Sequence, residues 1–293
     1  MTLHMEKGGI SISARRFLWK LSYLQRKCIF SVLSVGRLPT HISFIMDGNR
    51  RYGEQRNLKE GAGHKAGYLA LMLMVIYCCE LGIKYITAYA FSIDNFKRGP
   101  DKVQYIMDLM LEKIELELSK KDSLFSRYGV KVHFSGNMEL LSDPIKDAAK
   151  RLMVATANNS NTLLTVCFAY TSRNEILHAI QETCQEKLAQ IQLQESISEG
   201  RISMCNPGQG NHVLKLADIE KHMYMAIAPD PDIIIRTSGE NRLSNFLLWQ
   251  SANSCLISFS QLWPGISCWH LVWAVLNFQR NHYYLEKKKK KQI

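Results

Sequence analysis

The sequence predicts an α/β fold: a single domain with a mostly parallel central sheet of about six strands, flanked by helices. Strand-like apolar runs alternate with helical patterns along the whole chain, which is typical of parallel strands joined by helical crossovers. The chain has 293 residues, of which 46% are hydrophobic, so one domain can bury a sizeable core. A second domain is not required.

Strand and helix patterns can be assigned in order along the chain. The strand patterns lie at His41–Met46, Lys84–Ala90, Val130–Phe134, Leu163–Ala169, Asp232–Arg236 and Cys255–Phe259. The helical patterns lie near His64–Leu81, Asp101–Lys121, Asp143–Ala157, Ser172–Gln192, Lys215–Tyr224, Leu243–Ser254 and Ser267–Leu285. The proline pairs Gly99-Pro100 and Asp143-Pro144 are typical of helix starts. The polar stretch Glu195–Asn211 predicts a loop or a disordered insert.

Two of the expected helices are strongly apolar. The first, around Leu69–Tyr77, is apolar on every face. The second has apolar residues at helical spacing, namely Val103, Ile106, Met107, Met110 and Ile114. On the sequence alone, ordinary core packing accounts for most of these side chains. The longest apolar run, Leu69–Cys79, has eleven residues, whereas about 20 are needed to span a bilayer, so we expect a buried helix there.

The positive charge is concentrated at the two ends of the chain. The net charge is +11, and residues 1–40 hold seven Lys or Arg against one Glu, while residues 285–293 hold five Lys against one Glu. Apolar residues interleave with the charges of residues 10–35, which predicts a basic amphipathic helix. This helix could make peripheral contact with a membrane, or it could pack on this protein or on a partner. The eight cysteines include no Cys-x-x-Cys pair and indicate a reduced, intracellular protein.

The first of two phosphate-binding patterns follows the first expected strand. Asp47 can hold a hard divalent cation, and Gly48 lets the backbone approach an anion closely. Asn49 follows, and then Arg50 and Arg51, whose guanidinium groups can each bind phosphate oxygens in a bidentate manner. Taken singly, each of these residues also has an ordinary structural explanation; an Asp after a strand, for example, often caps a helix.

The second pattern follows the buried strand that ends at Arg236. It supplies two guanidinium groups and one hydroxyl, from Arg236, Arg242 and Ser244. Open α/β sheets bind ligands beyond the carboxyl ends of their strands, and both patterns lie at such ends. The two patterns together favour chemistry on diphosphates.

Four ordered motifs closely resemble those of the cis-prenyltransferases, the family of the undecaprenyl and dehydrodolichyl diphosphate synthases. These motifs are Met46–Tyr52, Gly63–Gly67, Ala88–Arg98 and Arg236–Glu240 with Arg242–Gln250. The resemblance covers roughly residues 38 to 285. The Ser92–Arg98 and Tyr170–Ser172 segments are most similar to eukaryotic members, and the Glu60–His64 segment to the plant dolichol and rubber branch.

The resemblance implies a catalytic domain at residues 38–285, between a basic amphipathic helix region at 1–37 and a lysine-rich tail at 286–293. It implies Mg²⁺ as cofactor and a hydrophobic tunnel that holds the growing prenyl chain. The implied reaction condenses isopentenyl diphosphate units onto an allylic diphosphate starter to give a long cis-polyprenyl diphosphate of dehydrodolichyl or rubber type. The chain has no Asp-Asp pair and so lacks the Asp-Asp-x-x-Asp signature of the all-helical trans-prenyl synthases.

The resemblance also assigns roles to individual residues. Asp47 carries the magnesium–diphosphate interaction and is the candidate that assists proton removal. The residues that match the cradle of the allylic diphosphate are Gly48, Asn49, Arg50, Arg51 and His64. The residues that match the contacts to isopentenyl diphosphate are Arg98, Arg236, Arg242 and Ser244. Ser92 and Asn95 match the residues that support the proton transfer.

Three departures from the bacterial members bear on these roles. Glu60 stands where those members have an arginine, which removes or replaces one contact to the allylic diphosphate. Cys255 stands where they have a metal-binding glutamate, and a neutral thiol is a poor ligand for magnesium. The region after Arg280 lacks the Arg-x-Gly motif that completes the neighbouring subunit's site in self-sufficient homodimers.

The missing motif suggests that this chain is the catalytic subunit of a heteromer. A Nogo-B-receptor-like, membrane-anchored partner would then donate the motif and place the enzyme at the cytoplasmic face of the endoplasmic reticulum, or on lipid or rubber particles. The alternative within the same fold is a non-catalytic scaffold subunit, but such subunits lack the motifs that this chain keeps. Nucleic-acid binding is not expected, because the basic residues lie in the tails and no basic face interleaved with aromatic residues is found.

Overall fold

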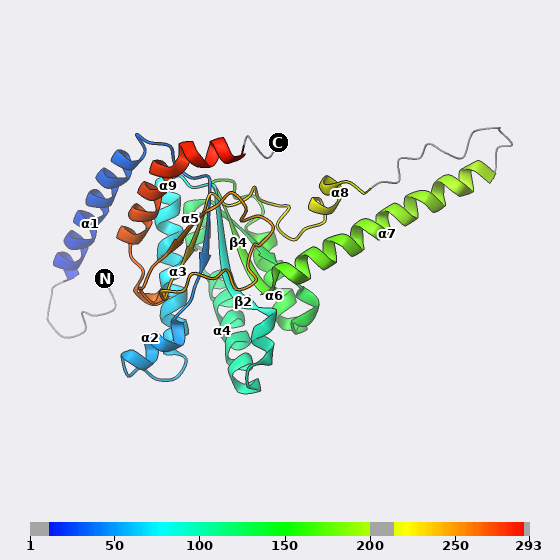
Figure 1. Ribbon diagram of the computed structural model, residues 1–293. Helices are drawn as coiled ribbons and strands as arrows, with labels where there is room; N and C mark the ends of the chain where they lie inside the picture. The colour runs from blue at the N-terminus through cyan, green and yellow to red at the C-terminus, as the bar shows by residue number, and fades with distance from the viewer. Residues whose placement is uncertain (1–11, 200–213, 290–293) are drawn as a thin grey trace.

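The computed structural model describes residues 12–199 and 214–289, and six parallel strands form its centre (Figure 1). The strand order is β3-β4-β2-β1-β5-β6, and every neighbouring pair is parallel. The strands are β1 His41–Ile45, β2 Tyr85–Ser92, β3 Val130–Ser135, β4 Thr162–Tyr170, β5 Ile233–Arg236 and β6 Cys255–Ser258. All six predicted strands are therefore confirmed, with ends that differ from the expected ones by at most two residues.

Helices and short 3₁₀ turns connect the strands. The helices are α1 Ile12–Leu33, α2 Asn49–Gln55, α3 Ala62–Leu81, α4 Pro100–Ser119, α5 Leu124–Tyr128, α6 Asp143–Ala155, α7 Ser172–Glu199, α8 Leu216–Glu220 and α9 Cys268–Lys289. The 3₁₀ turns are η1 Ile93–Lys97, η2 Met138–Leu140 and η3 Trp263–Gly265. The short helices α2 and α5 were not expected from the sequence.

Two expectations about local structure were wrong. The segment Leu243–Ser254 is a series of turns rather than a helix, because Ser244, Asn245 and Leu247 have positive φ angles that a helix does not allow. The polar stretch Glu195–Asn211 is not entirely a loop, since α7 continues to Glu199; the rest of that stretch lies outside the described residues.

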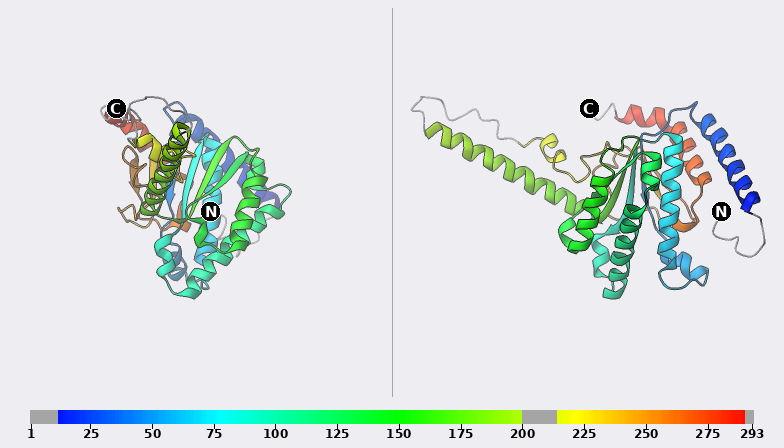
Figure 2. Two further views of the ribbon diagram at one scale, coloured as in Figure 1. Left: turned by 90° about the vertical axis from the view of Figure 1, so that its right-hand side faces the viewer. Right: turned by 180° about the vertical axis from the view of Figure 1, so that it is seen from behind.

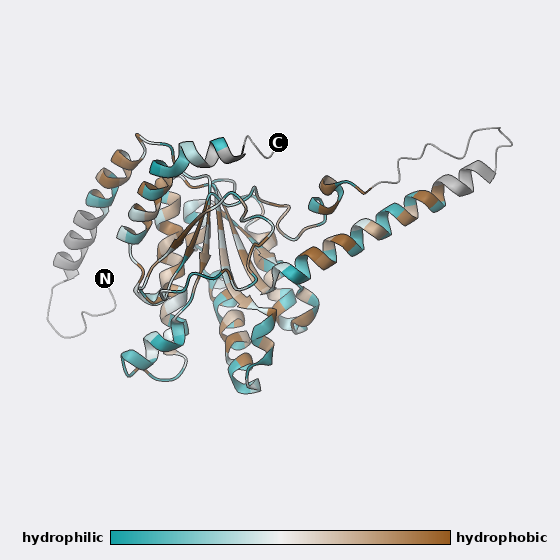
Figure 3. Ribbon diagram, viewed as in Figure 1, coloured by the Kyte–Doolittle hydropathy of each residue, from teal (hydrophilic) through white to brown (hydrophobic). Residues whose placement is uncertain are grey.

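One face of the sheet carries the larger part of the core. Phe44, Ile86 and Leu164 from the strands pack against α3 and α9, and α5 and α6 complete the layer. Trp263 is fully buried in this layer, and its ring lies 5.7 Å from that of Phe44. By length and composition α3 could span a membrane, yet in the fold it covers the sheet as a core helix (Figure 3).

A buried carboxylate organises the opposite face of the sheet. Glu175 is fully buried near the start of α7. It accepts hydrogen bonds from the backbone N–H of Met225 at 2.8 Å, from the hydroxyl of Tyr170 at 2.5 Å and from Nε2 of Gln250 at 3.2 Å. One side chain therefore joins β4, α7 and both irregular segments that flank β5.

The amphipathic N-terminal helix packs on this protein along its second half. Phe30 and Leu33 are buried, and Arg26 pairs with Glu80 of α3 at 3.2 Å. Gln279 of α9 donates a hydrogen bond to the carbonyl of Leu33 at 2.8 Å. The helix α1 thus lies beside α3 and α9, whereas α7 projects away from the other side of the sheet (Figure 2).

Loss of the Glu175 carboxylate should destabilise the fold. Glu175→Ala leaves three buried donors without an acceptor, which costs on the order of 3 kcal/mol or more of unfolding free energy. Urea denaturation of the purified proteins measures this difference. The control is Glu139→Ala. The exposed carboxylate of Glu139 pairs with Lys146 at the surface, and such an ion pair contributes less than about 1 kcal/mol to stability. Equal stability of both variants would contradict the structural role of Glu175.

Protonation of His41 should weaken the fold at low pH. Burial lowers the pKa of His41 from 6.5 to about 4, although Nδ1–H donates a hydrogen bond to the carbonyl of Pro229. Between these two pH values only the unfolded chain binds the proton, so stability is lost as the pH falls, by about 3 kcal/mol in total. We expect the unfolding free energy of His41→Gln to fall less steeply as the pH is lowered. Urea unfolding at a series of pH values measures this. Parallel pH curves for the two proteins would exclude this linkage.

Candidate active site

The two phosphate-binding patterns meet because β1 and β5 are neighbours. Ile45 pairs in register with Arg236, so the residues that follow both strands share one edge of the sheet. Nη2 of Arg236 donates a hydrogen bond to Oδ2 of Asp47 at 2.8 Å. The Arg236 side chain is 9% exposed and that of Asp47 29% exposed, so this ion pair is largely shielded from water. The structure confirms that the two segments converge.

The backbone of Asp47 is held on both sides. The hydroxyl of Thr237 accepts from the N–H of Asp47 at 3.1 Å and donates to its carbonyl at 2.7 Å. The N–H of Trp263 donates to the same carbonyl at 2.9 Å. Gly48 follows with φ +106°, where a Cβ atom would lie 2.8 Å from Cδ2 of Leu262. Only glycine allows this turn from β1 into α2.

The helix α2 brings Arg51 back to Asp47. Because Arg51 lies one helical turn later, its Nη2 reaches Oδ1 of Asp47 at 3.2 Å. The same nitrogen donates to Oγ of Ser238 at 2.7 Å. One carboxylate therefore lies between two guanidinium groups, and the cluster keeps an excess of positive charge that a diphosphate can neutralise.

Asp47 remains ionised in this environment. Burial alone would raise its pKa, but hydrogen bonding and charge from Arg236, with contributions from Ser238 and Arg51, lower the pKa below its ordinary value. A stable carboxylate suits a cation-binding role.

Arg236 also organises the segment that follows β5. Its Nη1 donates to Oγ of Ser244 at 2.7 Å and to the carbonyl of Arg242 at 2.5 Å. Its Nε is buried and has no acceptor among the described residues. The side chain of Arg242 is 63% exposed and pairs with Glu240. Ser244 is thus part of the central cluster, while Arg242 lies at its rim.

A second basic group lies around His64 at the start of α3. Burial lowers the pKa of His64, and the nearby charges of Arg98 and Arg50 lower it further, so the imidazole is mostly neutral at pH 7. Arg98 is exposed, and Arg50 is largely exposed and pairs with Glu54 at 3.4 Å. The predicted members of the diphosphate cradle therefore share one positively charged region.

Asn49 and the end of β2 complete the set of predicted residues. Asn49 begins α2, and its buried Oδ1 faces Gly67, where a Cβ atom would approach it to 2.0 Å. Ser92 ends β2, next to β1 in the sheet, and its hydroxyl accepts from the N–H of Asp94 at 3.1 Å. Asn95 follows in η1. Both therefore lie at the same edge of the sheet as Asp47.

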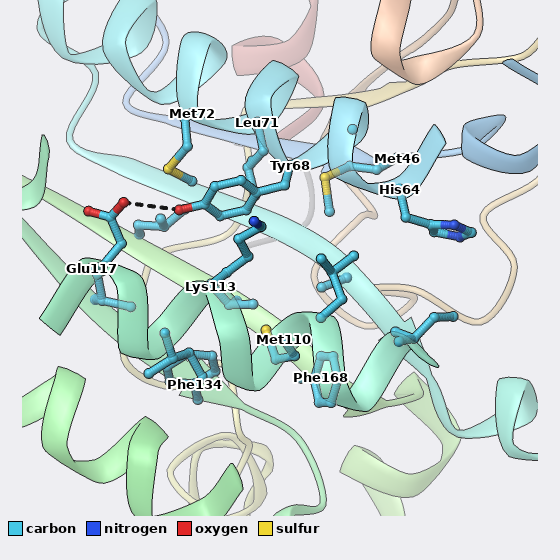
Figure 4. A pocket seen from close by; sticks show the side chains of 18 of the residues that line it. Met46, His64, Tyr68, Leu71, Met72, Met110, Lys113, Glu117, Phe134 and Phe168 are labelled. Atoms are coloured by element: carbon cyan, nitrogen blue, oxygen red, sulfur yellow. Dashed lines mark hydrogen bonds between the residues drawn. The ribbon is translucent and has the colours of Figure 1, made fainter. Parts of the chain in front are cut away.

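An apolar cavity opens beside this cluster. It has a volume of about 140 Å³ and lies between α3, α4 and the sheet, with Met46 and His64 at one end (Figure 4). Asn49 also lines it. The helix α4 contributes Ile106, Met110 and Ile114, whereas Met107 packs in the core. Both apolar helices thus line a cavity on one face and pack on another, as the resemblance implied.

The expected binding of Mg²⁺ depends on Asp47. The described residues hold no cluster of three or more His, Cys, Asp or Glu side chains suited to a metal ion. A single carboxylate is nonetheless sufficient for Mg²⁺, which typically takes one or two carboxylates together with substrate phosphates and water. Asp47 at the centre of a phosphate-binding cluster fits this pattern.

Two of the departures from the bacterial pattern can be located. Glu60 is exposed in the turn before α3. Cys255 begins β6, and its N–H pairs with the carbonyl of Asp232 at the amino end of β5. It therefore lies three residues, about 10 Å, from the strand ends where Asp47 is found. The thiol does not take the place of a metal ligand beside Asp47 within this chain.

Sequence reasoning missed several residues of the site. Thr237 and Ser238 lie inside the Arg236–Glu240 motif and have no role implied by the resemblance, although they hold Asp47 and Arg51. Trp263 lies outside the four motifs, yet its Nε1 donates to the carbonyl of Gly67 at 2.8 Å and so connects η3 to α3. Position inside the motif was a signal for the first two; no pattern marked Trp263.

Known proteins resemble this chain over most of its length. The family model described as putative undecaprenyl diphosphate synthase matches residues 45–285. The chain is 52% identical over 274 residues to dehydrodolichyl diphosphate synthase CPT3 of Solanum lycopersicum, covering 92% of this chain and 94% of that protein. It is 38% identical over 268 residues to the dehydrodolichyl diphosphate synthase complex subunit DHDDS of Homo sapiens, covering 92% and 75%. The higher identity to the plant protein agrees with the predicted branch.

A solved structure has the same fold. Lavandulyl diphosphate synthase from Lavandula x intermedia superimposes with a TM-score of 0.66 at 22% identity, covering 83% of this chain and 95% of that one. At this identity the likeness concerns the fold alone. The matched family model and the identity to the plant relative go further: this chain belongs to the undecaprenyl diphosphate synthase family of prenyltransferases.

Proposed function

We propose that this protein condenses isopentenyl diphosphate with an allylic diphosphate and extends it to a long-chain cis-polyprenyl diphosphate of the dehydrodolichyl type. One observation carries the proposal: the ion pair of Asp47 and Arg236 lies next to Met46, which lines one end of the apolar cavity. A substrate with a charged diphosphate head and a hydrocarbon tail fits both parts at once.

The cationic groups stabilise the leaving group. In the reaction the allylic C–O bond breaks, diphosphate leaves, and the double bond of isopentenyl diphosphate attacks the allylic carbon. Preorganised donors that face the developing negative charge are often the largest catalytic contribution. Arg50, Arg51 and neutral His64 surround the allylic diphosphate, while Arg98, Arg236, Arg242 and Ser244 hold isopentenyl diphosphate. A Mg²⁺ ion held by Asp47 and diphosphate oxygens would neutralise further charge.

Removal of a proton completes each condensation. The new carbon–carbon bond leaves a carbocation, which must lose a proton to form the next allylic diphosphate. Asp47 is ionised and lies between the two diphosphate-binding groups, so its carboxylate can assist this transfer. Ser92 and Asn95 lie at the end of the neighbouring strand and support the same step.

We further propose a membrane-anchored partner subunit, of the Nogo-B-receptor type, at the cytoplasmic face of the endoplasmic reticulum. The name of the human relative, a complex subunit, supports this. The surface of α7 also supports it, because Leu177, Ile180 and Leu188 form an exposed apolar stripe along a helix that projects from the body (Figure 3). The basic, partly apolar N-terminal region would then face the membrane.

Neutralising Asp47 should abolish turnover without unfolding the protein. Asp47→Asn keeps the shape of the side chain but removes the charge between Arg51 and Arg236. We therefore expect the incorporation of isopentenyl diphosphate to fall by about 100-fold or more. Incorporation of labelled substrate with magnesium measures the loss, and circular dichroism checks folding. The control is Asp147→Asn on the exposed face of α6. Near-normal turnover of Asp47→Asn would overturn the assigned role.

A partner should be required for full activity, and it should bind α7. We expect incorporation by the chain alone to be less than about one tenth of that with a membrane-anchored partner subunit co-expressed, a loss of the size caused by an incomplete catalytic cluster. Leu188→Asp should weaken co-purification of the two subunits, because it places a charge in the apolar stripe. Gln190→Asp, on the opposite side of α7, is the matched control. Full activity of the chain alone would refute the heteromer.

A further inference from the structure

A buried polar pair interrupts the apolar wall of the cavity. Glu117 of α4 lines the cavity, and its side chain is 5% exposed. Its Oε1 accepts from the hydroxyl of Tyr68 at 3.2 Å and from Nζ of Lys120 at 2.7 Å. Its Oε2 is buried and has no hydrogen-bond partner among the described residues. The site described above does not use this carboxylate.

The pair lies at the end of the cavity opposite the diphosphate-binding cluster. Figure 4 shows His64 and Met46 at one end and Glu117 at the other, with the ring of Tyr68 reaching towards Glu117. Along α4, the cavity lining begins at Ile106, so Glu117 lies eleven residues, about 16 Å, further along the helix. A hydrocarbon tail that grows from the cluster therefore meets this pair only after it has filled the first part of the cavity.

Glu117 differs from the other charged group in the wall. Lys113 also lines the cavity, with its ammonium group 5.5 Å from the ring centre of Tyr68, but this group pairs at 2.7 Å with Glu112, whose side chain is 52% exposed. The side chain of Glu117 is 5% exposed, and its Oε2 has no such partner among the described residues. Burial, together with the neighbouring carboxylate, raises the pKa of Tyr68, so its hydroxyl stays protonated as a donor to Glu117.

Apolar groups placed against this pair are unfavourable. A carboxylate oxygen without a donor already carries a desolvation cost, and a hydrocarbon packed on it excludes the water that could otherwise satisfy it. The tail must also pass the hydrogen bond from Tyr68 to Glu117, which links α3 to α4 across the cavity. Extension beyond this point is therefore less favourable than extension along the apolar part.

We propose that Tyr68 and Glu117 set how far the prenyl tail extends into the cavity, and thereby help to determine the length of the product. The inference rests on the proposed function, because the tail in question is that of the growing polyprenyl diphosphate. It makes the two residues determinants of product specificity and gives them no part in bond formation.

Product length in variants tests the proposal. Glu117→Leu and Tyr68→Phe remove the carboxylate and the hydroxyl, and we expect the longest products to shift upward by at least one isoprene unit while the initial incorporation rate stays within a few-fold of wild type. Products are sized by chromatography after incorporation with the partner present. The matched controls are Glu115→Leu, whose carboxylate pairs with Arg151 at the surface of α4, and Tyr77→Phe, which lies on α3 outside the cavity lining. Unchanged lengths in both test variants would overturn the proposal.

A binding series makes the test independent of turnover. Prenyl alcohols of increasing length compete with a fluorescent apolar probe for the cavity of the full chain. For the wild type we expect affinity to stop rising beyond a certain length, and in Glu117→Leu this limit should move to longer alcohols. The same limit in both proteins would overturn the inference even if Glu117→Leu proved inactive. If the wild type bound the alcohols with such a limit but incorporated no isopentenyl diphosphate, the proposed function would fail instead.

Discussion

The ion pair between Asp47 and Arg236 is the constraint on which the site depends. It joins the ends of β1 and β5, two strands whose residues are almost two hundred positions apart in the chain. Thr237 and Trp263 hold the backbone of Asp47, and Arg236 in turn holds Ser244 and the carbonyl of Arg242. Because these groups are fixed before any substrate arrives, little reorganisation is needed when a diphosphate binds.

Two helices that form part of the hydrophobic core also form the apolar part of the site. The helices α3 and α4 both start at the edge of the sheet where Asp47 lies, and both continue along one face of the sheet. Each buries one side in the core and leaves another side to the cavity. The first turns of these two helices thus lie near the diphosphate head group, and their later turns line the cavity for the hydrocarbon tail. Tyr68 and Glu117 mark one position along that cavity.

The sequence predicted the strands and the catalytic motifs better than the irregular segments. A buried parallel strand such as β5 is recognisable because Ile233, Ile234 and Ile235 form an unbroken apolar run, and Asp47 is recognisable because charged residues follow β1 closely. The turns at Leu243–Ser254 were missed because their positive φ angles come from tertiary contacts, such as the hydrogen bond from Arg236 to Ser244. The pair of Tyr68 and Glu117 is forty-nine residues apart, and no local pattern connects its members.

One substrate should occupy the cluster around Asp47 and the cavity between α3 and α4 at the same time. The most direct measurement is an experimental structure of the protein with a non-reactive allylic thiolodiphosphate. We expect diphosphate oxygens next to Asp47 and the arginine groups around it, with the hydrocarbon tail between α3 and α4 and directed towards Tyr68. A diphosphate bound away from Asp47, or a tail that lies on the outer surface of the protein, would exclude this mode of binding.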